Sequence, residues 1–218
     1  MPRRANVGSL RRARPSRTVK KAVLIVCEGS KTEPNYFGFF KRKFRLQNIS
    51  IDIFGKECGT DPLSVVRYGS DRFIADSSFD MCFCVIDRDS HDDHNFAKAK
   101  DLADKTDKKV NDREFAICLS DPCIEYWFLL HFVYSRAPFV RQGDKSRAQC
   151  AVDEIGKYIE GGYQKNCAEI GQILEGLLPT AMQNAEHAYR DMTSTGESNP
   201  STQMHLLMER LQSLLAKP

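Results

Sequence analysis

Three acidic residues come directly after apolar runs, in positions where side chains commonly do chemistry. Glu28 follows the run 22–27, and both Asp87 and Asp89 follow the run 81–86. In extended backbone, alternate side chains point the same way, so these two aspartates can share one side of the chain at a spacing of about 6.5 Å. Ligands collect at the carboxyl ends of parallel strands, so we expect all three carboxylates at one edge of a sheet.

Three carboxylates at one place repel each other unless some are protonated or a cation lies between them. Mg²⁺ and Mn²⁺ prefer oxygen ligands, complete their coordination with water, and can hold a phosphate group. The pattern therefore predicts a divalent metal site formed by Glu28, Asp87 and Asp89. The alternative interpretation is that these acids are turn residues and helix caps, which are common after strands.

Two further residues complete the catalytic candidates, which are Glu28, Lys31 and Glu125. Glu125 lies among apolar neighbours, where a carboxylate without a partner is costly. We expect it to serve as an acid–base group or further metal ligand; the alternative is an acid in the first helical turn, stabilised by the helix dipole. Lys31 is a candidate to contact a substrate phosphate, and its alternative is a solvated lysine. We expect His131 and His205 in the core.

The first 21 residues form a basic arm. They contain six arginines, two lysines and no acid, which leaves 24 basic against 29 acidic residues, a net charge of −5, in the rest of the chain. Such arms commonly bind nucleic acid through its phosphates, although plain solvated tails have the same composition. The candidate nucleic-acid-binding residues are Arg11, Arg12, Arg14, Arg17, Lys20 and Lys21 in the arm, together with Arg88.

Composition excludes several classes of protein. With 218 residues, 41% hydrophobic and 28% charged, the chain is typical of a globular domain with an appendage and not of a disordered or fibrous protein. Its longest apolar stretch, near 123–134, is too short to span a membrane and carries charge. No apolar segment of a secretory signal follows the arm. The eight cysteines are therefore expected as reduced thiols in a cytoplasmic protein.

Four apolar runs predict the strands of a sheet. They span 22–27, 49–54, 81–86 and 115–119, and their starts lie roughly 30 residues apart, the spacing of strand–helix–strand units. Three runs are apolar throughout, as parallel strands covered on both faces are. The run 49–54 alternates apolar with polar residues, which predicts an edge strand.

Helical patterns and breakers fill the intervals. We expect an α/β core over 22–135, a mostly parallel four-stranded sheet flanked by helices, preceded by a flexible arm over 1–21 and followed by a helical layer over 136–218 packed on the core. The first two expected helices begin at Thr32–Pro34 and at Asp61–Pro62, the third spans 95–108, and the fourth runs from Asp121–Pro122 to about Phe132. The next three span 147–159, 169–178 and 181–192, with Pro179 ending the helix 169–178, and the last begins at Pro200.

These residues resemble a known family. Glu28-Gly29 and Asp87-Arg88-Asp89 are similar to the two motifs of the Toprim fold, which type II topoisomerases, bacterial primases and overcoming-lysogenization-defect nucleases share. The segments 23–37, 121–132 and 199–202 resemble the RloB-like family more specifically, and the likeness covers roughly residues 15–215. Asp121 departs from it, because the family tends to have Asn there.

The resemblance implies a Toprim-like (Rossmann-like) fold and a nuclease that hydrolyses phosphodiesters of DNA or RNA with Mg²⁺ or Mn²⁺. In related Toprim nucleases the glutamate is a general acid–base group or metal ligand and the aspartates hold Mg²⁺; here these are Glu28, Asp87 and Asp89. It also implies the effector of an abortive-infection system against phage, working with an ABC/SMC-type ATPase encoded nearby. The alternative is a non-catalytic nucleic-acid- or nucleotide-binding subunit of such a complex, and a homo-oligomer is compatible with both.

Overall fold

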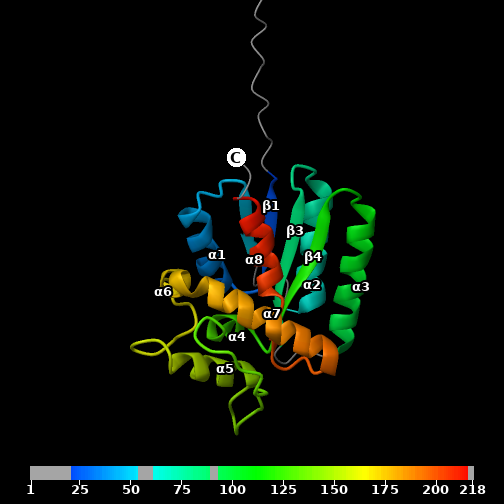
Figure 1. Ribbon diagram of the computed structural model, residues 1–218. Coiled ribbons are helices and arrows are strands. Elements are labelled where there is room, and N and C mark those ends of the chain that lie inside the picture. The colour runs from blue at the N-terminus through cyan, green and yellow to red at the C-terminus, as the bar shows by residue number, and fades with distance from the viewer. Residues whose placement is uncertain (1–20, 54–60, 89–92, 216–218) are drawn as a thin grey trace, which may run out of the picture.

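The protein folds around a five-stranded sheet (Figure 1). The structure, a computed structural model, describes residues 21–53, 61–88 and 93–215. The sheet order is β2-β1-β3-β4-β5, with parallel pairing throughout except between β4 and β5. The prediction of an α/β fold with a mostly parallel sheet is confirmed, and the sheet has one strand more than expected. The strands are β1 (Val23–Cys27), β2 (Ile49–Ile53), β3 (Met81–Asp87), β4 (Glu114–Asp121) and β5 (Ser201–Thr202).

The central strands are apolar because helices cover both of their faces. All five residues of β1 are buried, and so are the first six residues of β3. Such strands read as continuous apolar runs instead of alternating ones. β2 lies at the edge of the sheet, next to β1 only, as the alternation of its sequence predicted.

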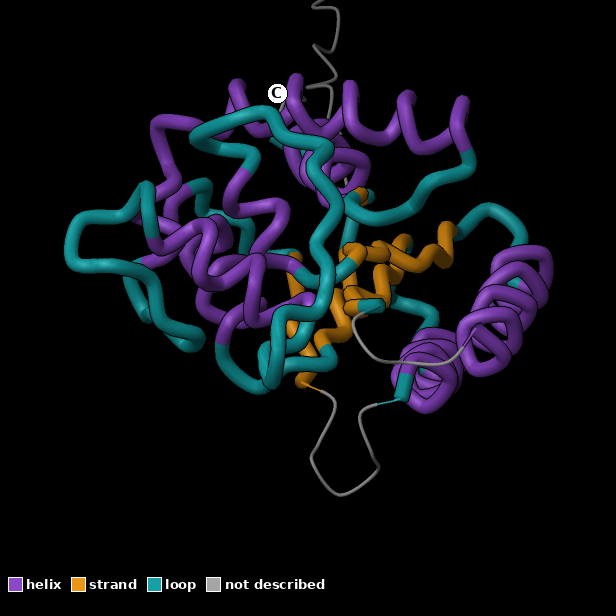
Figure 2. Tube along the Cα trace, turned by 90° about the horizontal axis from the view of Figure 1, so that it is seen from below, coloured by secondary structure: helices purple, strands orange, loops and turns teal. Residues whose placement is uncertain are grey.

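Helices pack on both faces of the sheet, and different helices cover the two faces (Figures 1 and 2). The first face carries α2 (Pro62–Ala75) and α3 (Asp93–Lys109), and the second carries α1 (Thr32–Lys43) and α4 (Ile124–Leu129). Tyr36 of α1 accepts a 2.8 Å hydrogen bond from the indole N–H of Trp127 in α4, and both side chains are fully buried. This contact fixes α4 against α1 beside the carboxyl ends of the strands.

The C-terminal part of the chain adds helices to the second face and a strand to the sheet. Its helices are α5 (Arg147–Gly156), α6 (Ile170–Leu174), a 3₁₀ turn at Glu175–Leu177, α7 (Leu178–Thr195) and α8 (Met204–Ser213). β5 pairs antiparallel with the end of β4 through Ser120–Thr202 and Asp121–Ser201. This part is therefore more than a helical layer, because it completes the sheet.

Three predicted helix boundaries are wrong, each next to a proline. Asp121 and Pro122 do not cap a helix: Asp121 ends β4, and α4 begins only at Ile124. Pro179 does not end a helix but occupies the first turn of α7, where a missing N–H costs nothing. Pro200 precedes β5 instead of starting a helix. The peptide bonds before Pro122 and Pro200 are cis.

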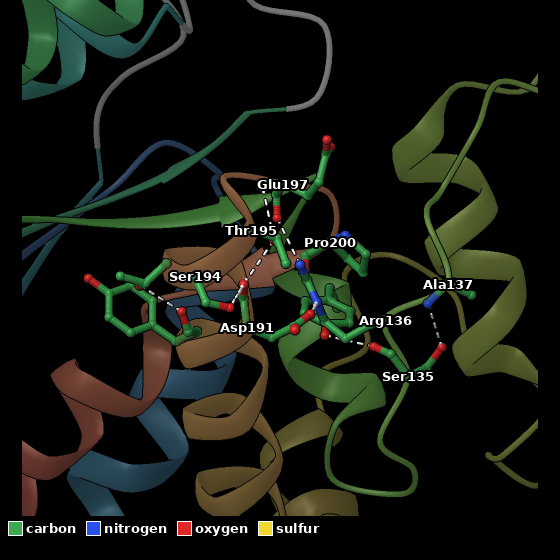
Figure 3. A network of polar contacts seen from close by, with 11 residues as sticks. Ser135, Arg136, Ala137, Asp191, Ser194, Thr195, Glu197 and Pro200 are labelled. Carbon is green, nitrogen blue, oxygen red and sulfur yellow. Dashed lines mark hydrogen bonds and ion pairs between the residues drawn. The ribbon is translucent and has the colours of Figure 1, made fainter.

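Arg136 holds the turn between α7 and β5 in place (Figure 3). Its Nε donates to Asp191 Oδ2 at 2.7 Å, its Nη2 donates to the carbonyl of Glu197 at 2.8 Å, and its Nη1 donates to the carbonyl of Pro200. The guanidinium thus joins the end of α7 to the residues that lead into β5. This turn carries Ser198, which reaches the carboxyl ends of the strands.

Candidate functional site

Glu28 and Asp87 meet at the carboxyl ends of adjacent strands. β1 and β3 pair in parallel with Cys27 opposite Val85, so Glu28 and Asp87 lie within one residue of the same level of the sheet. The backbone N–H of Asp87 donates to Glu28 Oε2 at 3.5 Å, and the N–H of Ile124 donates to Asp87 Oδ1 at 3.0 Å. The backbone amide of Ile124, in the first turn of α4, therefore points at the Asp87 carboxylate, and the backbone amide of Asp87, at the end of β3, points at the Glu28 carboxylate.

Glu33 is a third carboxylate in the same place. It lies in the first turn of α1, is 5% exposed, and accepts a 3.3 Å hydrogen bond from the N–H of Gly29. A Cβ atom on Gly29 would come within 2.2 Å of Glu33 Oε2. The absence of a side chain at Gly29 thus allows the Glu33 carboxyl group to lie against the backbone that follows β1.

Glu125 is the fourth carboxylate. It lies in the first turn of α4 and is 1% exposed. Its Oε1 accepts a 3.3 Å hydrogen bond from the hydroxyl of Tyr163, whereas no described group pairs with its buried Oε2. An unpaired buried carboxylate oxygen is costly, and it is typical of a site that binds something or carries a proton.

These four carboxylates line one cavity of about 230 Å³. Two lysines, Lys31 and Lys165, line it as well. The cavity therefore joins the ends of β1 and β3, the starts of α1 and α4, and the loop before α6. Its full lining is Glu28, Gly29, Ser30, Lys31, Thr32, Glu33, Asp87, Ile124, Glu125, Lys165 and Asn166.

Burial and mutual repulsion perturb the acids in the cavity. Burial raises the pKa of Asp87 well above its usual value, and the charges of Glu33, Glu125 and Glu28 raise it further. Burial likewise raises the pKa of Glu33 to about 7, with Glu125 and Glu28 contributing. Negative charge therefore accumulates here beyond what the protein neutralises, and a proton or a cation relieves it.

The structure brings only some of the predicted site residues together. Glu28, Asp87, Glu125 and Lys31 come together in the cavity. Arg88 lies nearby, but its guanidinium contacts protein groups: Nη2 is 2.5 Å from Asp93 Oδ1 and Nη1 donates to Ser198 Oγ at 3.1 Å. Lys21 is exposed just before β1. Outside the described residues lie Asp89, Arg11, Arg12, Arg14, Arg17 and Lys20.

The sequence did not predict the places of Glu33 and Lys165, which line the cavity, or of Tyr163, which donates to Glu125. Glu33 was interpretable as an ordinary acid at a helix start, and only its burial against Gly29 distinguishes it. Tyr163 and Lys165 belong to a polar loop between two helices, far along the chain from the acidic motifs. No local pattern marks them, because contacts with α1 and α4 decide their position. The two histidines expected in the core, His131 and His205, are 1% and 2% exposed, as predicted.

The cavity has the donor chemistry of a cation site. Within the residues that the structure describes, no group of three or more His, Cys, Asp and Glu side chains is arranged to hold a metal ion. Carboxylate oxygens are nevertheless the ligands that Mg²⁺ and Mn²⁺ prefer, and the buried Glu125 Oε2 lacks a described partner.

Comparison with known families gives one match. The model of the family described as "RloB-like protein" matches residues 23–211, which is most of the chain. The chain belongs to the RloB-like family. In this RloB-like chain the match includes every residue that lines the acidic cavity. No curated protein and no solved structure gives a significant match. In the described part of the chain, no helix combines the length and the apolar character that crossing a bilayer requires.

Proposed function

We propose that this RloB-like protein is a divalent-metal-dependent nuclease of the Toprim type, which hydrolyses phosphodiester bonds in DNA or RNA. The observation that supports this most is the meeting of Glu28, Asp87, Glu33 and Glu125 in one cavity at the carboxyl ends of parallel strands. Ligand sites of open α/β sheets form at this edge. The accumulated negative charge favours a cation there, and a phosphate is the ligand class that such a cation binds.

Each acid has a distinct place in the proposed chemistry. Asp87 and Glu28, with Asp89 of the same motif, would hold Mg²⁺ or Mn²⁺, which would supply positive charge against the phosphate oxygens. Glu28 would also take a proton from water or return one to the leaving oxygen. Glu33 can carry a proton near neutral pH, because burial raises its pKa to about 7, and Glu125, which is buried in the same cavity, would be a further metal ligand or acid–base group. Lys31 is a candidate to contact the substrate phosphate.

The basic arm would supply affinity for nucleic acid without selecting a sequence. Its eight positive charges precede an otherwise acidic chain, and contacts with phosphates depend on charge and salt concentration. Lys21, the last of them, is exposed beside β1. Arg88 stays in this set as a prediction, although its present contacts with Asp93 and Ser198 would have to be exchanged for a phosphate.

We further propose that the nuclease is the effector of an anti-phage abortive-infection system and works with an ABC/SMC-type ATPase. This follows from the family and from no contact in the structure. The competing proposal is a non-catalytic subunit that binds nucleic acid or a nucleotide at the same acidic edge. Cleavage of a phosphodiester separates them, and the assay must include the ATPase, because a partner-gated nuclease is silent alone.

The decisive experiment compares wild type with Asp87→Asn. Plasmid and tRNA are incubated with Mg²⁺ or Mn²⁺, with and without EDTA, and with and without the ATPase. The amide keeps the oxygen that accepts from Ile124 N–H but removes the charge. We expect a loss of about 100-fold or more in cleavage rate, the usual cost of removing one charge-stabilising group.

The control for Asp87→Asn is Asp101→Asn, an exposed residue of α3 that pairs only with Lys105 among described groups. Circular dichroism and thermal unfolding show whether each variant is folded. Asp87→Asn protein that cuts as fast as wild type refutes the assignment of Asp87. Wild-type protein that binds nucleic acid but cuts nothing, even with the ATPase, favours the non-catalytic subunit.

A further inference from the structure

The loop Tyr163–Cys167, between α5 and α6, closes one side of the acidic cavity. It comes from the C-terminal helical part of the chain, whereas the acids come from the ends of β1 and β3 and the starts of α1 and α4. Lys165 and Asn166 of this loop line the cavity. The cavity is therefore shared between the α/β core and a loop that lies more than a hundred residues after β1 and α1 in sequence.

Contacts on both sides of Lys165 hold its backbone against α1. Asn166 N–H donates to Thr32 Oγ1 at 3.3 Å, and the side-chain amide of Asn35 donates to the carbonyls of Asn166 and Cys167 at 3.3 and 3.4 Å. On the other side, the Tyr163 hydroxyl donates to Glu125. The loop is thus tied to the first turns of both helices that carry the cavity's acids.

The lysine of this tied loop, Lys165, lines the cavity together with its four carboxylates. Lys31 lines the cavity too, but it lies outside the tied loop, directly before α1. Arg88 points to Ser198 and Asp93. A phosphate that enters this cavity meets repelling carboxylates, and a positive charge at the rim would add to that of the proposed metal ion in offsetting the repulsion.

We infer that Lys165 is a substrate-contacting residue of the site, whose ammonium group binds an oxygen of the substrate phosphate, and that Asn35 positions it. This inference rests on the proposed nuclease function and extends it to a residue outside the acidic motifs. A lysine ammonium acts as a compact charge with three donors, which suits a phosphate oxygen. The C-terminal part of the chain then belongs to the catalytic site itself.

The test measures steady-state cleavage of an oligonucleotide by the full chain with its ATPase, in Mn²⁺. Lys165→Ala should lower kcat/KM by about 100-fold, the usual cost of removing one group that stabilises charge on the reacting phosphate. Lys165→Arg should restore at least about a tenth of wild-type kcat/KM, because the charge returns in a different shape. Mn²⁺ affinity should stay within about threefold of wild type in both variants, because the acids are unchanged.

Asn35→Ala tests the positioning role separately. It should lower kcat about tenfold in the wild-type background and have no effect in Lys165→Ala protein, because a residue that acts only through Lys165 loses its influence with it. A merely structural role for Asn35 would give the same loss in both backgrounds and would overturn this part. The surface control is Lys105→Ala, whose side chain pairs with Asp101 in α3.

The outcomes are distinct. If wild type cleaves and Lys165→Ala stays within about threefold of it, the inference falls and the proposed nuclease function stands. If Lys165→Ala loses Mn²⁺ affinity in parallel with activity, Lys165 shapes the acidic site and does not contact substrate, which also overturns the inference. If wild type cleaves nothing under any condition, the proposed function itself fails. Lys165 is exposed, and thermal unfolding confirms that each variant is folded; Lys165→Gln replaces Lys165→Ala if it is not.

Discussion

Asp87 and Asp121 end the neighbouring strands β3 and β4, yet their carboxylates have opposite surroundings. Asp121 is 1% exposed and both of its oxygens have partners: Arg147 Nη1 lies 3.1 Å from Oδ1, and Ser198 Oγ donates to Oδ2 at 2.7 Å. Arg88 Nε lies 3.9 Å from the same Oδ2. Asp87 instead faces three other carboxylates, and its pKa is raised.

The difference shows that the partners of a buried acid indicate whether its role is structural or functional. Where cations and hydroxyls pair every oxygen, as at Asp121, the charge is compensated inside the protein and the group holds structure together. Where acids face acids and one oxygen of Glu125 has no described partner, compensation must come from outside, as a proton or a bound cation. Both sites lie at the same edge of the sheet, so position alone does not distinguish a structural acid from a functional one.

The largest effect is expected from removing Asp121, the acid whose charge is compensated inside the protein. Asp121→Ala should lower the free energy of unfolding by about 3 kcal/mol, because it leaves Arg147 and Arg88 without their shared partner. Urea unfolding measures this. The matched control is Asp153→Ala, which removes an exposed ion pair with Lys145 and should cost far less than Asp121→Ala, because solvent screens exposed pairs. If both variants lose the same stability, the charge balance around Asp121 does not hold structure.

Removing a charge from the acidic cavity should have the opposite effect on stability. Burial raises the pKa of Glu33 from its usual value of 4.5 to about 7, so its contribution to stability is fully present below pH 4.5 and is lost as the pH rises through about 7. Glu33→Gln keeps a neutral group of the same shape at every pH, and its oxygen can still accept from Gly29 N–H. In EDTA at pH 8 this variant should be more stable than wild type, on the order of 2 kcal/mol.

Urea unfolding at pH 4, 6 and 8 checks the Glu33 prediction. Near pH 4 the two proteins should be equally stable, and the difference should open as the pH rises. Added Mg²⁺ should reduce it at pH 8, because a cation offsets the repulsion that the wild type carries and binding stabilises the folded state. Parallel pH profiles for the two proteins would show that Glu33 carries no shifted proton in this cavity.

The sequence predicted the parts of this comparison that local pattern controls. Continuous apolar runs located β1 and β3, and alternation placed β2 at the edge. The motifs Glu28-Gly29 and Asp87-Arg88-Asp89 predicted an acidic site, and the structure brings Glu28 beside Asp87. These predictions succeed because strand period and strand-end position follow from neighbouring residues alone.

Other parts depend on contacts that no local pattern shows. β5 is a two-residue strand without an apolar run, and its pairing with β4 is held by Arg136 and by the hydroxyl contact of Ser120 with Thr202. Lys165 reaches the cavity through contacts with α1 across more than a hundred residues. The segment before Pro122 suggested a helix cap, but the strand continues through Asp121 because Arg147 and Ser198 satisfy its carboxylate.

The smallest effect on stability is expected at Ser198, whose hydroxyl group contacts Asp121. Ser198→Ala removes one hydrogen bond to Asp121 and one from Arg88. It should cost about 1 kcal/mol, because Ser198 is half-buried and water can replace the hydroxyl in part. Ser194→Ala, which loses an exposed contact to the Asp191 carbonyl in the same region (Figure 3), should cost less than about 0.5 kcal/mol.

A double variant separates the loss of Ser198 from a general weakening of its turn. If Ser198 stabilises the protein by compensating Asp121, its replacement in Asp121→Ala protein should cost almost nothing, because the charge it served is gone. An unchanged cost in that background would mean that Ser198 acts through the turn and through Arg136, not through the carboxylate. Compensation at this edge of the sheet would then depend on the arginines alone, and the contrast with Asp87 would reduce to which acid has a guanidinium beside it.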